Sequence, residues 1–111
     1  MEKVIEIRRH YLKCNLAGFT YWDGCIAFER LKMGCKLRIV REVNNKFDPN
    51  AIALYYKNFK LGYIPSRVNE QMSLFLDMGY NNMFEARICR INKETHTESQ
   101  IEINIYVLRN I

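Results

Sequence analysis

The sequence lacks several features that would assign it at once to a large class of proteins. It contains no run of about 18 apolar residues, the length that a membrane-spanning helix requires. Its first dozen residues are interrupted by charged side chains and do not resemble a secretory signal peptide. None of its four cysteines has the CxxC spacing of zinc ribbons and thioredoxin-type motifs. We therefore expect a cytoplasmic protein with no membrane partner, no metal and no cofactor.

Proline, glycine and histidine are also scarce, with two, five and two residues in a chain of 111. The remaining composition is that of a globular protein, and the length suits a single domain over residues 1–111 with one core. No Walker-type loop or Ser–His or Cys–His arrangement is present. We expect a binding protein rather than an enzyme. A metal-dependent nuclease using Glu42 and Asp48 is the catalytic alternative.

Positive charge is concentrated in the first part of the chain. The formal net charge is +5, from 17 basic and 12 acidic side chains. Residues 1–60 hold 12 basic and 6 acidic side chains, whereas residues 61–111 hold 5 and 6. This imbalance permits a polyanionic partner, but charge alone does not identify one.

Apolar alternation and turn signals predict a mainly β (α+β) fold. We expect strands over residues 11–19, 36–42, 51–56, 61–64, 84–91 and 101–108. Residues 44–50 are rich in turn formers and include a proline, so they form a loop, and residues 57–60 form a hairpin turn. The hairpin tip over residues 92–99 is polar. This order of elements favours a small β-barrel of about six strands.

Two helices are expected between these strands. A short second helix over residues 25–31 would turn Ile26, Ala27 and Leu31 inward. The central helix would begin at Ser66, a suitable N-cap, and end at Gly79. Its apolar side chains repeat at helical spacing and would plug the barrel.

The order of five motifs resembles the HIRAN domain family. The motifs are Gly18–Gly24 (GFTYWDG), Leu31–Gly34 (LKMG), Leu37–Glu42 (LRIVRE), Asn45–Leu54 (NKFDPNAIAL) and Leu61–Pro65 (LGYIP). The resemblance runs from about residue 16 to about residue 79, and the chain looks like a stand-alone bacterial member. It implies an OB-like β-barrel of about six strands with a helix. It also implies binding of single-stranded DNA, because a fork-remodelling member captures the 3′-hydroxyl end of such a strand.

The resemblance also implies a role for individual residues. Tyr21 and Phe47 fall at the positions of the base-stacking aromatics, and Asp48 falls at the carboxylate that contacts the 3′-hydroxyl. Three positions depart from the fork remodeller. Thr20 stands where it has an arginine, Tyr63 where it has a histidine, and Arg67 is the nearest counterpart of a lysine.

Residue chemistry in the same region agrees with this interpretation. Sequence-independent binding of a single strand needs aromatic faces for bases and cations for phosphates. The aromatic faces can come from Tyr21, Trp22, Phe47 and Tyr63. The positive charge can come from Lys46, Arg41, Arg38 and Arg67. A carboxylate among them would accept a hydrogen bond from a terminal hydroxyl and repel a phosphate. Asp48 would thereby distinguish strand ends from strand interiors.

Structural roles and a different partner remain open at this point. Asp48 before Pro49 is a common turn residue that binds a nearby backbone amide. Arg41 and Glu42 could form a structural ion pair, and Tyr21 and Phe47 could be core aromatics. The whole barrel groove could instead hold a peptide, which would make the protein an interaction adaptor. A motor or nuclease partner protein is a further expectation for a repair or fork-processing role.

Overall fold

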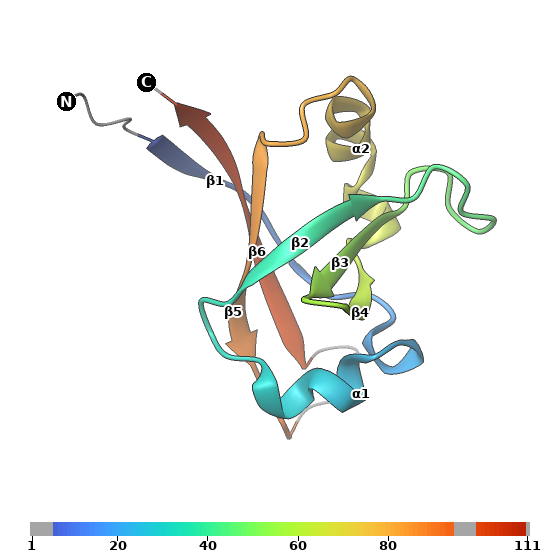
Figure 1. Cartoon of the computed structure of the whole chain (residues 1–111), viewed down its shortest axis with the longest axis vertical. Coiled ribbons are helices and arrows are strands. Elements are labelled where there is room, and N and C mark those ends of the chain that lie inside the picture. The colour runs from blue at the N-terminus through green and yellow to red at the C-terminus, as the bar shows by residue number, and fades with distance from the viewer. Residues whose placement is uncertain (1–5, 95–99, 111) are drawn as a thin grey trace.

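The computed structural model describes residues 6–94 and 100–110, which form one antiparallel sheet of six strands in the order β1-β6-β5-β2-β3-β4 (Figure 1). The strands are β1 (Glu6–Asn15), β2 (Lys36–Arg41), β3 (Ile52–Tyr56), β4 (Phe59–Tyr63), β5 (Phe84–Ile91) and β6 (Ile101–Asn110). Helical segments are η1 (Phe19–Tyr21), α1 (Gly24–Ala27), η2 (Phe28–Arg30), η3 (Ser66–Val68) and α2 (Glu70–Asp77), where η denotes a 3-10 turn. The prediction of a mainly β domain with about six strands is confirmed.

Strands β1, β6 and β5 form the longest part of the sheet. Successive strand residues point to opposite faces, so the alternation on β6 places Ile101, Ile103 and Ile105 on one face, where they are fully buried. Their register partners on β5 include Ile88 and Ala86, which are buried as well. Each of these isoleucine side chains contributes roughly 1.5–3 kcal/mol when it leaves water. This inner face is the core of the domain.

The sheet curls because β2 changes partner along its length. Its first residues, Lys36 and Leu37, pair with β5, whereas Arg38–Arg41 pair with β3. Beyond the end of β1, Ala17 exchanges two backbone hydrogen bonds with Tyr63 of β4, at 2.8 and 2.9 Å. This bridge brings the two edges of the sheet together without a full ladder. The result is an OB-like barrel that is not closed.

Gly62 allows this close approach of the two edges. Its φ is +151°, and a Cβ built there would lie 2.3 Å from the carbonyl oxygen of Ala17. No side chain fits in that space, and only glycine adopts this conformation without strain.

The short helix differs from the prediction in extent and orientation. An α-helical turn of only four residues, α1, is followed by the 3-10 turn η2, so the α-helical spacing is not sustained over residues 25–31. Ala27 and Leu31 are buried as expected, but Ile26 is 70% exposed and its predicted inward orientation is wrong. Gly24 instead packs against Phe19, since a Cβ at residue 24 would meet that ring at 2.5 Å.

The central helix begins later than predicted. Ser66 lies in η3 and makes no side-chain capping bond, and α2 begins at Glu70 after Asn69. Met72 and Leu76 turn to the core as the spacing indicated, and Gly79, with φ +93°, follows the helix end. Pro65 and Ser66 are compatible with a 3-10 turn as well as with an α-helix, so the sequence does not distinguish between these two structures.

Strand boundaries also differ from the prediction at β1, β4 and β6. β1 begins at Glu6 rather than residue 11 and ends at Asn15 rather than residue 19, because Phe19 leaves the strand and is buried within η1. β6 ends at Asn110 rather than residue 108. β4 begins at Phe59, so the turn between β3 and β4 is only Lys57 and Asn58, with Lys57 in the left-handed region at φ 53°. The predicted polar tip at 92–99 lies partly outside the described residues.

Candidate nucleic-acid interface

The loop between β2 and β3 is held by the side chain of Asn45. Its Oδ1 accepts hydrogen bonds from the backbone amides of Phe47 and Asp48, at 2.8 and 2.9 Å. Its Nδ2 donates to Glu42 Oε1 at 3.1 Å, which ties the loop to the end of β2. The ring of Phe47 is left 96% exposed by this arrangement. Phe47 is therefore a surface ring on an anchored loop and not a core aromatic.

Both carboxylate oxygens of Asp48 have partners within the chain. Oδ1 accepts from the backbone amide of Asn50 at 2.9 Å, which is the turn role that the sequence left open. Oδ2 accepts from Asn69 Nδ2 at 2.8 Å. Because a carboxylate has about four acceptor positions, each oxygen of Asp48 keeps one for a further donor. The contacts fix the carboxylate without saturating it.

Asn69 is a buried residue that sequence reasoning did not identify. It is 1% exposed, and its orientation is set by Asp48, because a flipped amide would turn its carbonyl toward an acceptor. Its Oδ1 is the buried side-chain oxygen without a hydrogen-bond partner in the described part of the chain. Its position just before α2 therefore places a fixed donor behind the carboxylate of Asp48.

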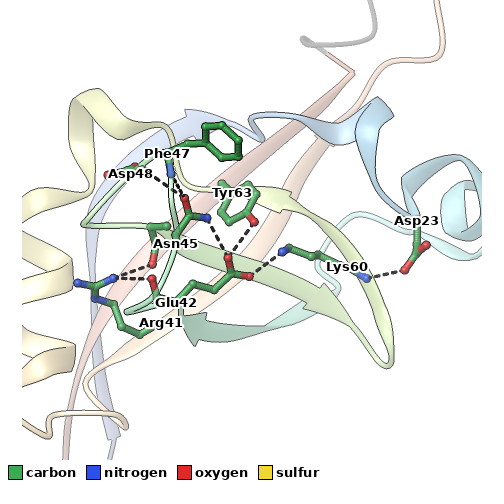
Figure 2. Close-up of polar contacts among 9 residues, drawn as sticks. Asp23, Arg41, Glu42, Asn45, Phe47, Asp48, Lys60 and Tyr63 are labelled. Carbon is green, nitrogen blue, oxygen red and sulfur yellow. Dashed lines mark hydrogen bonds and ion pairs between the residues drawn. The ribbon is translucent and has the colours of Figure 1, made fainter.

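Glu42 is the centre of a polar network next to this loop (Figure 2). Its Oε1 accepts from the Tyr63 hydroxyl at 2.9 Å and from Asn45, and its Oε2 pairs with Lys60 Nζ at 2.6 Å. Burial alone would raise the pKa of Glu42, but the hydrogen bonds from Lys60, Asn45 and Tyr63 outweigh it and hold that pKa below its usual value. Glu42 is therefore a stable carboxylate that connects β2, β4 and the loop.

Lys60 is the cationic partner and lies between two aromatic rings. Its Nζ is 3.8 Å from the ring centroid of Trp22 and 4.6 Å from that of Tyr63. Burial would lower the pKa of Lys60, but its bond to Glu42 outweighs that effect and raises the pKa above its usual value. With only 13% of its side chain exposed, Lys60 has a structural position and is not a free phosphate contact.

The backbone of Lys60 also fixes the segment that carries Tyr21. The amide of Asp23 donates to the Lys60 carbonyl at 2.8 Å, and the Lys60 amide donates to Asp23 Oδ2 at 3.3 Å. Phe19 anchors the other end of this segment in the core. Between them, Tyr21 closes η1 with its ring 81% exposed. Like Phe47, Tyr21 is an exposed ring on an anchored segment.

The predicted residues thus occupy two neighbouring parts of one connected structure. Phe47, Asp48 and Tyr63 meet around Asn45 and Glu42, and the segment with Tyr21 joins them through Lys60. Lys46 is exposed in the same loop.

Arg41 has a different environment from that of an open phosphate contact. Its guanidinium binds both carboxylate oxygens of Asp77, at 2.9 and 3.2 Å, and the carbonyls of Glu42, Pro49 and Ala51. Only 14% of its side chain is exposed. Arg41 therefore ties the loop to α2, and its ion-pair partner is Asp77 rather than the adjacent Glu42.

Arg67 is exposed in η3 and lines a groove of about 760 Å³. The groove lies between β1 and α2 and reaches Asn50, the neighbour of the Asp48 turn.

No group of three or more His, Cys, Asp or Glu side chains that could hold a metal occurs in residues 6–94 and 100–110. Within the same residues, no helix is long and apolar enough to cross a bilayer.

Comparison with known proteins assigns the chain to a family. The sequence matches the HIRAN domain over residues 10–108, and the chain therefore belongs to the HIRAN domain family. This membership supports the coarser functional expectation of a nucleic-acid-binding module. A search of the curated proteins finds no significant match.

Two solved structures share the fold. A crystal structure of a Lactobacillus plantarum protein aligns with a TM-score of 0.78 and 22% identity, covering 94% of this chain and 98% of that one. The HIRAN domain of human HLTF aligns with a TM-score of 0.63 and 16% identity, covering 93% of this chain and 74% of that one. At these identities the similarity concerns the fold.

Proposed function

We propose that the protein captures single-stranded DNA at its 3′-hydroxyl end, in DNA repair or the processing of stalled forks. The observation that carries the proposal is the exposure of two large rings on anchored segments. Tyr21 and Phe47 are 81% and 96% exposed, although hydrogen bonds fix the backbone around both. Solvent-exposed rings on an ordered backbone offer stacking surfaces, and stacking contributes about 1–3 kcal/mol of binding free energy per base.

Asp48 supplies the preference for an end. Its carboxylate is fixed by Asn50 and Asn69, and each oxygen keeps acceptor capacity for a further donor. A terminal 3′-hydroxyl can donate to it, whereas an esterified 3′-oxygen cannot, and a 3′-phosphate is repelled by its charge. Lys46 and Arg67 are the exposed cations beside this position and would attract the preceding phosphates.

The proposal is tested by fluorescence titration with labelled single strands that end in a 3′-hydroxyl or a 3′-phosphate, and with a blunt duplex. We expect the 3′-hydroxyl strand to bind most tightly and log affinity to fall with log salt, by about 0.7 per phosphate contact. Equal binding to all three DNAs would refute end capture. Binding only to a protein partner, with little salt dependence, would favour the adaptor.

Two substitutions separate stacking from end recognition. Tyr21→Ala should weaken binding to all single strands by roughly 5- to 150-fold, the equivalent of one stacked base. Asp48→Asn should reduce the preference for the 3′-hydroxyl over the 3′-phosphate more than it reduces total affinity. Tyr80→Ala and Glu29→Gln are matched controls, because both residues are exposed and lie outside the proposed site. A Tyr21→Ala protein that binds like wild type would show that the site is misplaced.

A further inference from the structure

The outer face of the sheet, opposite the core, carries a row of cationic and aromatic side chains across five strands. We call it the outer row, and its members are Arg8 of β1, Tyr106 of β6, Arg87 of β5, Lys36 and Arg38 of β2, and Tyr55 of β3. Strand register places them on one face. Arg87 pairs with Lys36, Lys36 and Arg38 are two residues apart, and Arg38 pairs with Tyr55.

One end of the outer row is a packed cluster on β1, β6 and β5. The guanidinium of Arg8 lies 4.1 Å from the ring centroid of Tyr106 and donates to Glu85 Oε1 at 3.0 Å. Arg87 donates to the same oxygen at 2.8 Å and to the Gly34 carbonyl. Glu85 is only 7% exposed on its side chain, whereas Arg8 is 45% and Arg87 35% exposed. The carboxylate is covered, and the two cations face water.

The other end of the outer row lies on β2 and β3. The Arg38 guanidinium is 4.7 Å from the ring centroid of Tyr55 and is exposed. Lys36 is also exposed and has no ion-pair partner among residues 6–94 and 100–110. A guanidinium stacked on a ring is pre-oriented and keeps N–H groups for an oxygen ligand.

The balance of charge along the outer row is positive. Arg8, Arg87, Lys36 and Arg38 are opposed by Glu85 alone within the row. At its margin Lys13 pairs with Glu102 at 3.4 Å, and His10 contacts Tyr106 edge-on and approaches Asn104. Solvent-exposed cations can bind the phosphates of a single strand, and the aromatic rings between them can stack with its unpaired bases.

The outer row leads to the proposed end-capture site. Tyr55 pairs in register with Lys60 of β4, whose ammonium lies against Trp22, the neighbour of Tyr21. From β3 to β1 the row crosses four inter-strand spacings, or roughly 19 Å along the sheet. That distance accommodates several nucleotides, which is within the range of about 4–16 for one OB-type fold.

We propose that the outer row binds the phosphate backbone of the single strand whose 3′ end occupies the site at Tyr21, Phe47 and Asp48. This inference rests on the proposed function, because it assumes that a strand end is held there. The site then selects the end, and the outer row adds affinity that increases with strand length and is insensitive to base sequence.

The test compares 5′-labelled oligothymidines of 4 and 12 nucleotides, each with a 3′-hydroxyl, on wild type and on Lys36→Ala/Arg38→Ala. We expect wild type to bind the 12-mer at least tenfold more tightly than the 4-mer. In the variant the 4-mer should bind within twofold of wild type, while most of the advantage of the 12-mer is lost. The salt slope for the 12-mer should fall by about 1.4, since each lost phosphate contact removes about 0.7.

The matched control is Arg9→Ala/Lys93→Ala, which removes the same charge. Arg9 neighbours Arg8 on β1 but projects from the opposite face, and both residues are exposed. If this control loses as much 12-mer affinity as the variant, diffuse charge rather than the outer row is responsible and the inference is wrong. An unchanged 12-mer advantage in Lys36→Ala/Arg38→Ala overturns it as well.

Two further outcomes separate this inference from the proposed function. If wild type binds the 12-mer with either a 3′-hydroxyl or a 3′-phosphate equally, and the Lys36 and Arg38 substitutions abolish that binding, end capture fails while the outer row stands as a backbone-binding surface. An acidic decapeptide, oligoglutamate, is included as a second probe. If it binds in a Lys36- and Arg38-dependent way while DNA binding ignores both residues, the surface serves a protein partner and the inference is refuted.

Discussion

Replacing Glu42 by glutamine tests whether the polar network holds the candidate site together. The substitution keeps the size of the side chain but removes the charge opposite Lys60, which is 13% exposed and 2.6 Å from the carboxylate. It also replaces one of the two oxygens that accept from Lys60, Asn45 and Tyr63 with a donor group. Hydrogen bonds to charged groups contribute about 1.5–3 kcal/mol each to stability. When one partner is lost, the other group stays buried without a hydrogen bond, and its desolvation is no longer compensated.

We therefore expect Glu42→Gln to lower the free energy of unfolding by about 2–3 kcal/mol at pH 7. For a domain of this size that corresponds to a decrease in Tm of about 8–12 °C. Urea denaturation followed by circular dichroism measures the change. Glu29→Gln is the matched control, because Glu29 is exposed in η2 and its loss should change stability by less than about 0.5 kcal/mol.

The pH dependence of the same difference gives a second test. The pKa of Glu42 is lowered in the folded protein, so its contribution is present above the unfolded pKa and is lost as pH falls through the folded value. The pKa of Lys60 is raised, so its contribution is present below the unfolded pKa and is lost as pH rises through the folded value. The stability gap between wild type and Glu42→Gln should therefore narrow in acid and in strong base. A gap that stays constant into acid, or no gap at pH 7, would refute the assignment of Glu42 as the ionised centre.

Other predictions concern the scaffold and the cysteines. Arg41→Lys should lower stability by about 2 kcal/mol, because an ammonium cannot reach Asp77 and three carbonyls together, yet leave the salt slope of DNA binding unchanged; a smaller slope would make Arg41 a phosphate contact. Gly62→Ala should prevent folding or lower the Tm far more than Gly34→Ala, which shares a positive φ but has nothing within 4 Å of its Cβ position; equal thermal shifts would contradict this. In the native protein at pH 8, iodoacetamide should modify exposed Cys25 and spare Cys14, since burial raises the pKa of Cys14 to about 11. Mass spectrometry of the peptides measures which thiol reacts first, and modification of Cys14 before Cys25 would contradict the prediction.

The sequence predicted the parts of the fold that depend on local pattern. Strands β2, β3 and β5 were placed to within one residue, because alternation and the turn formers around them are visible in a short window. The start of α2 was misplaced, because Ser66 has the chemistry of an N-cap but begins the 3-10 turn η3, which precedes the helix. Ile26 was misplaced because α1 is too short for helical periodicity to decide its orientation.

The sequence singled out the exposed rings of the candidate site, Tyr21 and Phe47, but not most of the residues that support them. Asp48 bonds its neighbour Asn50 as turn chemistry indicates, and motif order alone pointed to the loop of Phe47. The local sequence predicts that Lys60 lies in a hairpin turn and does not indicate its supporting role. That role depends on its contact with Trp22, which is 38 positions away in sequence. Arg41 did carry a signal, since it has the same strand phase as the inward-facing Leu37 and Ile39, and that phase disfavours an open phosphate contact.

If the candidate site binds a nucleobase as proposed, the separation of exposed rings from their supports favours that binding. Tyr21 and Phe47 bury little of their surface in the free protein, so they add little to its stability. Asn45, Glu42 and Lys60 meanwhile order the backbone on which the rings sit. Because that ordering is completed on folding, a nucleobase that enters the site does not have to restrict the loop again, and more of the stacking energy appears as affinity. On this reasoning, substitutions of the rings should change binding with little effect on unfolding, whereas substitutions of the supports should change both.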